Sequence, residues 1–361
     1  VDIWAVLTNN TVLAAFPHTI AGAIAVAGGF LLGIAWYQLW RRRKDGIDTV
    51  DANGRVVVGE AADIPGRDKA DHRVWLTSLR LGAVVAIVGF GAVAITGDIQ
   101  GKLMYEQQPL KMAAAEAACH TGTSFSVLSV GKLGSQDCSE VIPVIEIPGV
   151  LSFLAKGDFT TEMPGLNELI PQYQELYGTN LPDSELYGER AGQVIEYMPN
   201  LEVTYWGFRI MIGFGALAAF AAVVALWLTR KGTVPVSKPI MQLAVFGILA
   251  PFGANAAGWI FTEMGRQPFV VAPNPNPSGV DGVFMFTAAA VSPGVDGWEI
   301  VFSLVSLGLV YLVLMVVEVM LLARFVRAGI AGVMPERFHD DDADGPDGDA
   351  GSRDDVLAFA Y

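Results

Sequence analysis

The 361-residue sequence is short of charge, since Asp, Glu, Lys and Arg make up only 17% of it while 52% is hydrophobic. Its mean hydropathy of +0.43 is too high for an ordinary soluble domain. The apolar residues gather in runs near the roughly 20 residues that a helix needs to cross a bilayer. These runs cover residues 13–40, 76–96, 206–229, 239–262 and 298–323. The sequence therefore predicts an all-α integral membrane protein, a polytopic bundle of about five transmembrane helices.

The beginning of the chain has neither an initiator methionine nor the basic start and cleavage site of a signal peptide. We expect a truncated or processed chain, or one product of a split gene. Cysteine is also scarce: Cys119 and Cys138 lie in one long polar segment, without the CxxC spacing of a metal site. They can form a disulfide if that segment faces an oxidising exterior, or remain two thiols.

Basic residues orient the predicted spans by the positive-inside rule. RRRK follows the first span, Arg230 and Lys231 follow the third, and Arg324 and Arg327 follow the fifth. With these segments in the cytoplasm, the segments between spans two and three and between spans four and five face outward. The chain is then predicted to have four parts. Residues 1–96 hold two spans and the cytoplasmic loop 41–75 between them, and residues 97–205 form a large extracytoplasmic loop. Residues 206–328 hold three spans, and residues 329–361 form an acidic, disordered cytoplasmic tail. The net charge of −14 argues against nucleic acid as a partner.

Two of the predicted loops carry local structure. The outer loop holds helix-like stretches at Pro109 to Ala118 and Leu166 to Tyr177. The cytoplasmic loop holds NGRVVVGEAADIPG, which predicts a small hairpin-like insertion. Lys111 and Glu116 are five residues apart, so on a helix they point to different faces. With Gln108 they offer hydrogen-bonding and proton-accepting groups beside the membrane, or they form a solvated amphipathic helix.

Ionisable or ligating residues in the spans gather near one end. His18 and Met211 begin spans that both start outside, so they lie at a similar depth. His with Met is an axial pair of low-spin haems, and Arg209 is a candidate partner for a haem propionate. The alternatives are a proton relay or a satisfied polar group for the histidine and plain packing for the methionine. Glu263 and Arg266 close the fourth span, as part of a site or as an interfacial ion pair.

Four stretches together resemble subunit I of the cytochrome bd quinol oxidases. They are FPHTI, GDIQ followed by QQPLKMAAAEA, FRIMIGFG and GWIFTEMGRQPF, and the resemblance covers residues 10–330. It implies that His18 and Met211 are the axial ligands of the low-spin haem b. The outer loop is then the family's quinol-binding Q-loop. It also implies that quinol binding and proton transfer belong to Gln108, Lys111 and Glu116. Glu263 is implied at the iron of a high-spin haem. The other residues implied to lie beside the haems are Arg209, Trp259 and Arg266.

The resemblance implies electrogenic oxidation of quinol at the outer face of the cell membrane and reduction of oxygen to water at a di-haem site. That site takes a high-spin haem b with haem d or a third haem b. A second oxidase subunit is the implied partner. The family's subunit I begins with about four further spans, which are not in this sequence. The sequence is then either a C-terminal portion of subunit I or one half of a split subunit, whose other half is a separate chain that carries those spans. Phe269 stands where the family usually has Trp. The rival interpretations are a single-haem, non-catalytic membrane cytochrome and a haem-free channel or transporter.

Overall fold

The computed structural model describes residues 2–50, 56–58, 67–131, 138, 141–231, 234–235, 237–273, 283–290 and 294–330. The chain divides into two units, Val1–Ser303 and Leu304–Tyr361. The predicted acidic tail lies almost wholly outside the described residues.

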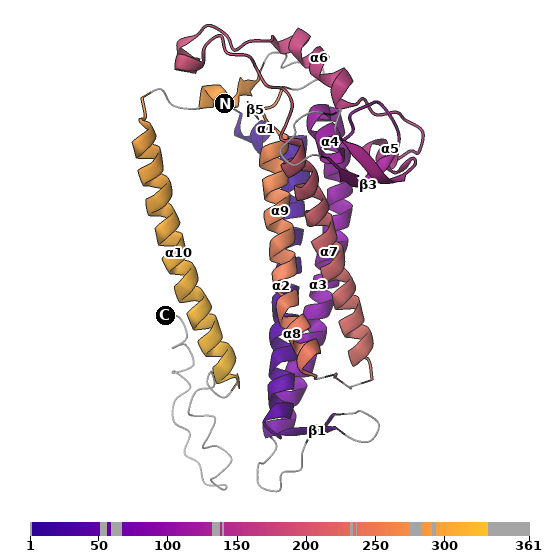
Figure 1. Ribbon diagram of the computed structural model, residues 1–361. Helices are drawn as coiled ribbons and strands as arrows, with labels where there is room; N and C mark the ends of the chain where they lie inside the picture. Colours follow the sequence, from indigo (N-terminus) through magenta and orange to yellow (C-terminus); the bar gives the residue numbers. More distant parts are fainter. Residues whose placement is uncertain are drawn as a thin grey trace. The chain divides into compact units, whose positions relative to one another are not determined.

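Five helical segments in the described part of the chain are long and apolar enough to cross a membrane, which confirms the predicted number of spans (Figure 1). They are α2 (Asn10–Lys44), α3 (Arg67–Gln107), α7 (Leu201–Thr229), α8 (Lys238–Gly247) together with α9 (Leu249–Gly265), and α10 (Gly297–Ala328). A short helix, α1 (Ile3–Leu7), precedes them. The chain thus has the predicted class, an all-α bundle with small β-hairpins in its loops.

The helices differ from the apolar runs in two places. Helix α2 begins at Asn10, because the Asn9 side chain caps it by accepting from the Val12 N–H, so Pro17 lies inside the helix and does not start it. The fourth span is two helices that meet at Ile248. Pro251 has no N–H to donate to the carbonyl four residues earlier, which removes one helical hydrogen bond at this junction.

Glycines let α2 and α3 pack backbone against backbone. A methyl group added at Gly28 would come within 2.3 Å of the Ala86 nitrogen, and one at Gly82 within 2.6 Å of the Leu32 nitrogen. Small residues at such crossings are typical of membrane helices, where close van der Waals packing replaces the hydrophobic effect. Helix α9 also lies close to both neighbours. An added methyl group at Gly22 of α2 would come within 2.7 Å of the Asn255 side chain, and one at Gly207 of α7 within 3.2 Å of Phe261 Cβ.

One end of the bundle carries an extramembrane layer, called the head here and made by described residues of 108–200 and 266–290 (Figure 1). Its helices are α4 (Pro109–Glu116), α5 (Val150–Lys156), α6 (Leu166–Tyr177), η2 (Glu185–Arg190) and η3 (Thr287–Ala290). Its antiparallel strand pairs are β3 (Phe125–Val130) with β4 (Ile142–Ile147) and β5 (Phe269–Val271) with β6 (Met285–Phe286). Helices α4 and α6 confirm the two helical stretches predicted in the outer loop.

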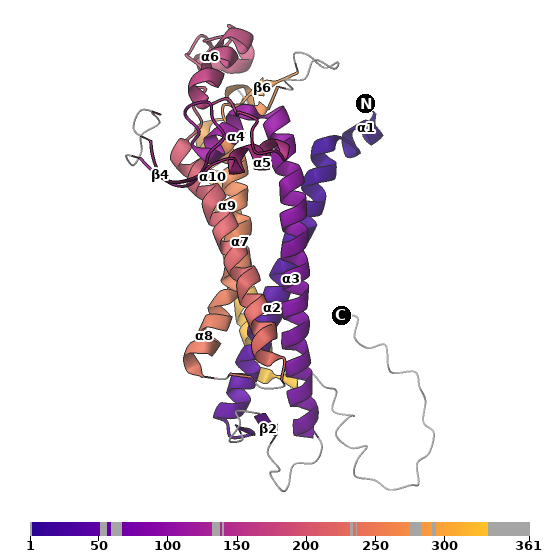
Figure 2. The ribbon, with the colours of Figure 1, turned by 90° about the vertical axis from the view of Figure 1, so that its right-hand side faces the viewer.

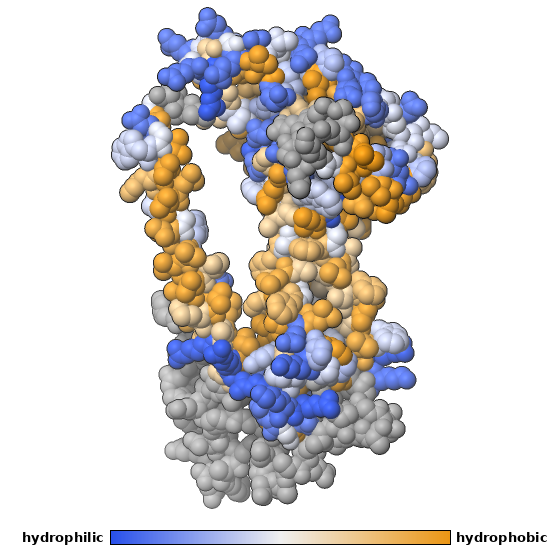
Figure 3. All heavy atoms as spheres, viewed as in Figure 1, coloured by the Kyte–Doolittle hydropathy of each residue, from blue (hydrophilic) through white to orange (hydrophobic). Residues whose placement is uncertain are grey.

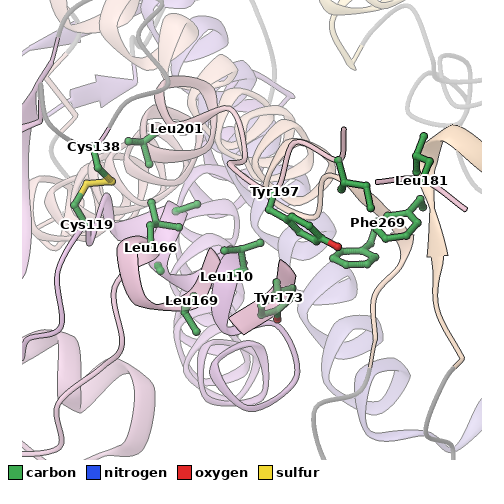
Figure 4. Packing of buried hydrophobic residues seen from close by; sticks show 14 residues of the cluster. Leu110, Cys119, Cys138, Leu166, Leu169, Tyr173, Leu181, Tyr197, Leu201 and Phe269 are labelled. Carbon is green, nitrogen blue, oxygen red and sulfur yellow. A yellow bond between two sulfur atoms is a disulfide. The ribbon is translucent and has the colours of Figure 1, made fainter. Parts of the chain in front are cut away.

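The head has its own hydrophobic core (Figure 4). Leu110 of α4, Leu166 and Tyr173 of α6 and Phe269 of β5 are all buried in it. Tyr173 and Phe269 also contact each other as a tilted ring pair, with centroids 6.1 Å apart and an angle of 56° between the ring planes. A disulfide joins Cys119 to Cys138 at the edge of this core, which settles the open question about the two thiols.

The opposite end of the bundle carries a hairpin, with β1 (Asp48–Val50) antiparallel to β2 (Val56–Val58). Of the stretch 53–66 in which a hairpin was predicted, only β2 is described, and it pairs with a strand that precedes the stretch. A buried charge cluster holds it there. Asp48 accepts from Arg42 Nε at 3.1 Å and lies 2.9 Å from His72 Nδ1. Hydrogen bonds from these two partners hold the pKa of Asp48 below its usual range, although burial opposes them.

Candidate functional site

His18 lies in α2 with its ring turned toward α3. Its Nδ1 is 3.0 Å from the Thr96 hydroxyl, and that hydroxyl donates its own proton to the Ala92 carbonyl at 2.7 Å. With the hydroxyl proton on the Ala92 carbonyl, Nδ1 is the donor to Thr96. A neutral His18 then carries no proton on Nε2, which leaves that atom free to bind a metal. The sequence analysis missed Thr96, whose only signal is a hydroxyl in an otherwise apolar stretch of α3.

Met211 lies in α7 against α9, where an added methyl group at Gly258 would come within 2.7 Å of its sulfur. An added methyl group at Gly22 of α2 would likewise come within 2.7 Å of Asn255 Oδ1 of α9. His18 is one helical turn from Gly22 toward the head, and Gly258 is one turn from Asn255 toward the head. His18 and Met211 therefore lie at a similar depth near the head end, as predicted. An imidazole with a free Nε2 and a thioether at one level fit a haem with His and Met axial ligands.

Arg209, two residues before Met211, is bound to the head. Its Nη2 donates to Glu116 Oε2 at 2.6 Å, and its Nε donates to the Ser126 carbonyl at 3.2 Å. Its guanidinium also lies over the rings of Phe125 and Tyr205, 4.4 and 4.5 Å from their centroids. The structure thus gives Arg209 a carboxylate partner that the sequence analysis did not foresee. Tyr205 had a visible signal, because it precedes Arg209 by one helical turn.

Glu116 ends α4 and is the most deeply buried acid of the site, with 1% of its side chain exposed. Burial raises the pKa of its carboxyl, and the charge and hydrogen bond of Arg209 act against that rise. Its second oxygen, Oε1, has no hydrogen-bond partner among the described residues. A buried carboxylate oxygen without a partner is costly, so it is well suited to accept a hydrogen bond from a ligand.

Lys111 lies on the other face of α4, as its spacing from Glu116 predicts. Its Nζ is 5.2 Å from the centre of the Phe261 ring, and its stem packs on Gly265. Burial lowers the pKa of Lys111 to about 8; the charge of Arg266 adds to this, and Glu263 opposes it. This amine therefore changes charge close to physiological pH.

Glu263 and Arg266 pair with each other at the head end of α9, 2.5 Å apart and each about one-third exposed. Both predicted roles, an interfacial ion pair and a haem-associated group, remain compatible with this contact. The Nε of Arg266 and the Oε1 of Gln108 are buried and have no hydrogen-bond partner among the described residues. With Lys111 and Tyr173 they line a small pocket that is open to solvent.

Trp259 lies apart from these contacts, because 69% of it is exposed on the surface of α9. Glu116 pairs with Arg209 of α7, the helix that carries Met211. Lys111, Gln108, Glu263 and Arg266 meet at the end of α9, on the other face of α4. The predicted residues thus form two adjoining polar clusters above the level of His18 and Met211.

Comparison with known proteins gives one consistent result. The model of the cytochrome bd terminal oxidase subunit I family matches residues 1–330. The chain is 28% identical to a cytochrome bd ubiquinol oxidase subunit 1 of Bacillus subtilis over 91% of its own length and 59% of the relative's. It is 24% identical to a cytochrome bd-II ubiquinol oxidase subunit 1 of Escherichia coli, over 89% of its own length and 63% of that relative's. The chain thus spans about 60% of the length of these relatives.

The fold also has a solved counterpart. The bd oxidase from Geobacillus thermodenitrificans matches with a TM-score of 0.63 and 22% identity, over 91% of this chain and 60% of the other. At this identity the likeness concerns the fold alone. Together with the five apolar helices, it makes the chain a multi-pass membrane protein.

Proposed function

Because the chain belongs to the cytochrome bd terminal oxidase subunit I family, we propose that it is the haem-binding, quinol-oxidising part of an electrogenic quinol:oxygen oxidoreductase. The outer loop, which begins after α3 ends at Gln107 and not at the predicted residue 97, forms the quinol-binding Q-loop on the extracytoplasmic face of the cell membrane. The 41–75 loop and the 329–361 tail face the cytoplasm. Subunit II is the expected partner. The orientation rests on the basic segments, such as RRRK, at the end opposite the head.

His18 Nε2 and the Met211 sulfur would hold the low-spin haem b, and Glu263 would serve the high-spin haem, with Trp259 and Arg266 beside it. Bound haems, including haem d or a third haem b at the oxygen site, supply the electron acceptors and the place where oxygen becomes water. The residues of this chain bind and orient the quinol and remove its protons.

The observation that carries the proposal is the buried pair of Glu116 and Arg209. Glu116 comes from α4 of the head and Arg209 from α7, two residues before Met211. The pair therefore joins the proposed proton acceptor to the helix of the proposed haem ligand. The free Oε1 of Glu116 would accept the hydroxyl hydrogen of a quinol, and its raised pKa makes it a stronger base than an exposed glutamate.

The test of quinol binding is Lys111→Met, with Lys238→Met, an exposed lysine of α8, as the matched control. A lost charged hydrogen bond is worth about 1.5–3 kcal/mol, so we expect the KM for a short-chain quinol to rise about tenfold or more in the oxygen-uptake assay. The wild-type KM should also rise as the pH passes about 8, because Lys111 then loses its charge. The variant should show no such pH dependence. An unchanged KM with an intact pH profile would exclude Lys111 from the quinol site.

The hydroxyl of Thr96 gives a second test, on the proposed haem ligand. Thr96→Val keeps the side-chain shape but removes the acceptor of the His18 Nδ1–H bond. Groups that orient a metal-ligating histidine typically contribute about 10–100-fold in affinity, so we expect weaker haem retention and a shifted midpoint potential in a redox titration. Thr19→Val is the control, since the Thr19 hydroxyl donates to its own helix at Ala15. Equal behaviour of the two variants would show that Thr96 does not orient His18.

A further inference from the structure

The β3–β4 hairpin of the head exposes apolar side chains where a water-facing hairpin would carry polar ones. All six residues of β4 are exposed. The apolar residues of this hairpin patch are Val127, Val130, Ile142, Val144, Ile145 and Ile147. Figure 3 shows apolar side chains gathered in this part of the head, on its side toward the membrane-spanning helices. An exposed apolar cluster of this kind marks an interaction surface on a protein or a membrane.

The hydrogen bonds of β3 fix the depth of the hairpin. The Ser129 N–H donates to the Tyr205 hydroxyl at 2.7 Å, and the Ser126 carbonyl accepts from Arg209. Both partners lie in α7 directly before its uncharged run, 210–229. That run has about the length that spans the hydrocarbon core of a bilayer. The hairpin therefore lies where the hydrocarbon begins.

Helix α5 gives an independent indication of the same level. Its Lys156 lies 3.7 Å from Glu106 and over the Tyr105 ring, both near the end of α3. The exposed rings of Phe153 and Phe159 stack next to it, with centroids 5.3 Å apart. Aromatic rings with lysines whose stems lie along them are typical of the interface between lipid and water.

We propose that the β3–β4 hairpin and the Phe153–Phe159 pair lie in the headgroup–acyl boundary of the lipid bilayer and hold the head on the membrane surface. The surface continues into the lipid-facing side of α7, where Trp206 and Ile210 are exposed. Deeper insertion is excluded, because β4 pairs only with β3 among the described strands and carries the charged Glu146. The inference depends on the membrane spans and not on the proposed oxidase activity.

The test is the depth of a nitroxide attached at Val144→Cys, in the full oxidase complex in vesicles of phosphatidylcholine and phosphatidylglycerol. The native cysteines are joined in a disulfide and do not compete for the label. Leu176→Cys is the control: it is also exposed and apolar, but it belongs to α6 at the far end of the head (Figure 2). We expect the Val144 label to collide several-fold more often with oxygen than with a water-soluble nickel chelate, and the Leu176 label to show the reverse.

Two results would overturn the proposal. Equal access of the nickel chelate to both labels would place the hairpin in water. A Val144 label shielded from both oxygen and nickel would show that a protein chain covers the patch. Val130→Cys, at the end of β3, repeats the measurement if the first variant does not assemble.

Discussion

Replacing His18 or Met211 with alanine is expected to abolish the low-spin haem b band in a dithionite-reduced minus oxidised spectrum of membranes that carry the chain. Each change removes one of the two proposed axial ligands, and a low-spin spectrum needs both. The structure supports the pair because both residues lie near the head end at one depth. It also supports His18 through the bond between Nδ1 and Thr96, which turns Nδ1 toward α3 and away from the metal-binding role of Nε2.

Matched controls separate ligation from general damage to the protein. His120→Ala and Met285→Ala remove the same residue types from exposed positions in the head, so both should keep the band. Chain abundance in the membrane is measured for every variant. A band that survives either His18→Ala or Met211→Ala, at normal abundance, would rule out that residue as an axial ligand.

The sequence predicted the elements of this fold whose pattern is local. The spans follow from long apolar runs, and α4 and α6 follow from helix-like composition between glycines and prolines. The opposed directions of Lys111 and Glu116 follow from their spacing alone, and their separate contacts with Phe261 and Arg209 confirm it. The predicted outer loop began too early, because α3 continues to Gln107 beyond its apolar run.

Contacts between distant segments could not be predicted in this way. Arg209 and Glu116 are 93 residues apart, and only the docking of the head on α7 brings them together. For Arg209 the sequence analysis offered a haem propionate as partner, while the structure shows a carboxylate and the carbonyl of Ser126. The disulfide was undecided for the same reason, since spacing alone does not bring two cysteines to bonding distance.

The pairing of Glu116 with Arg209 makes quinol oxidation depend on both residues and on pH. If Glu116 is the base, Glu116→Gln should lower kcat for oxygen uptake about 10²–10⁴-fold, the usual contribution of a general base. Arg209→Gln leaves a buried carboxylate without its cation. Arg209 lowers the pKa of Glu116 against the effect of burial, so its removal raises that pKa further. The acid limb of kcat/KM should then move to higher pH.

The direction in which stability depends on pH follows from the same pKa shift of Glu116. A carboxyl whose pKa is raised by folding stabilises the protein fully below the pKa of an unfolded glutamate, and this contribution is lost as the pH rises through the raised value. Arg209→Gln should therefore destabilise the head most at neutral and alkaline pH, because breaking a buried pair costs about 3–5 kcal/mol. Adding Glu116→Gln to that variant removes the unpaired charge, so hydrogen exchange of α4 should slow again while activity stays low.

The pH profile distinguishes this role from a merely structural one. Arg230→Gln, at the opposite end of α7, is the control and should leave the acid limb in place. Arg209→Lys keeps the positive charge but lacks the planar guanidinium. It should therefore bring the acid limb of kcat/KM back close to the wild-type pH while kcat stays below the wild-type value. If the acid limb of Arg209→Gln stays where it is in the wild type while the low-spin band is intact, Glu116 is not the group whose protonation controls quinol oxidation. The buried pair would then serve only to dock α4 on α7.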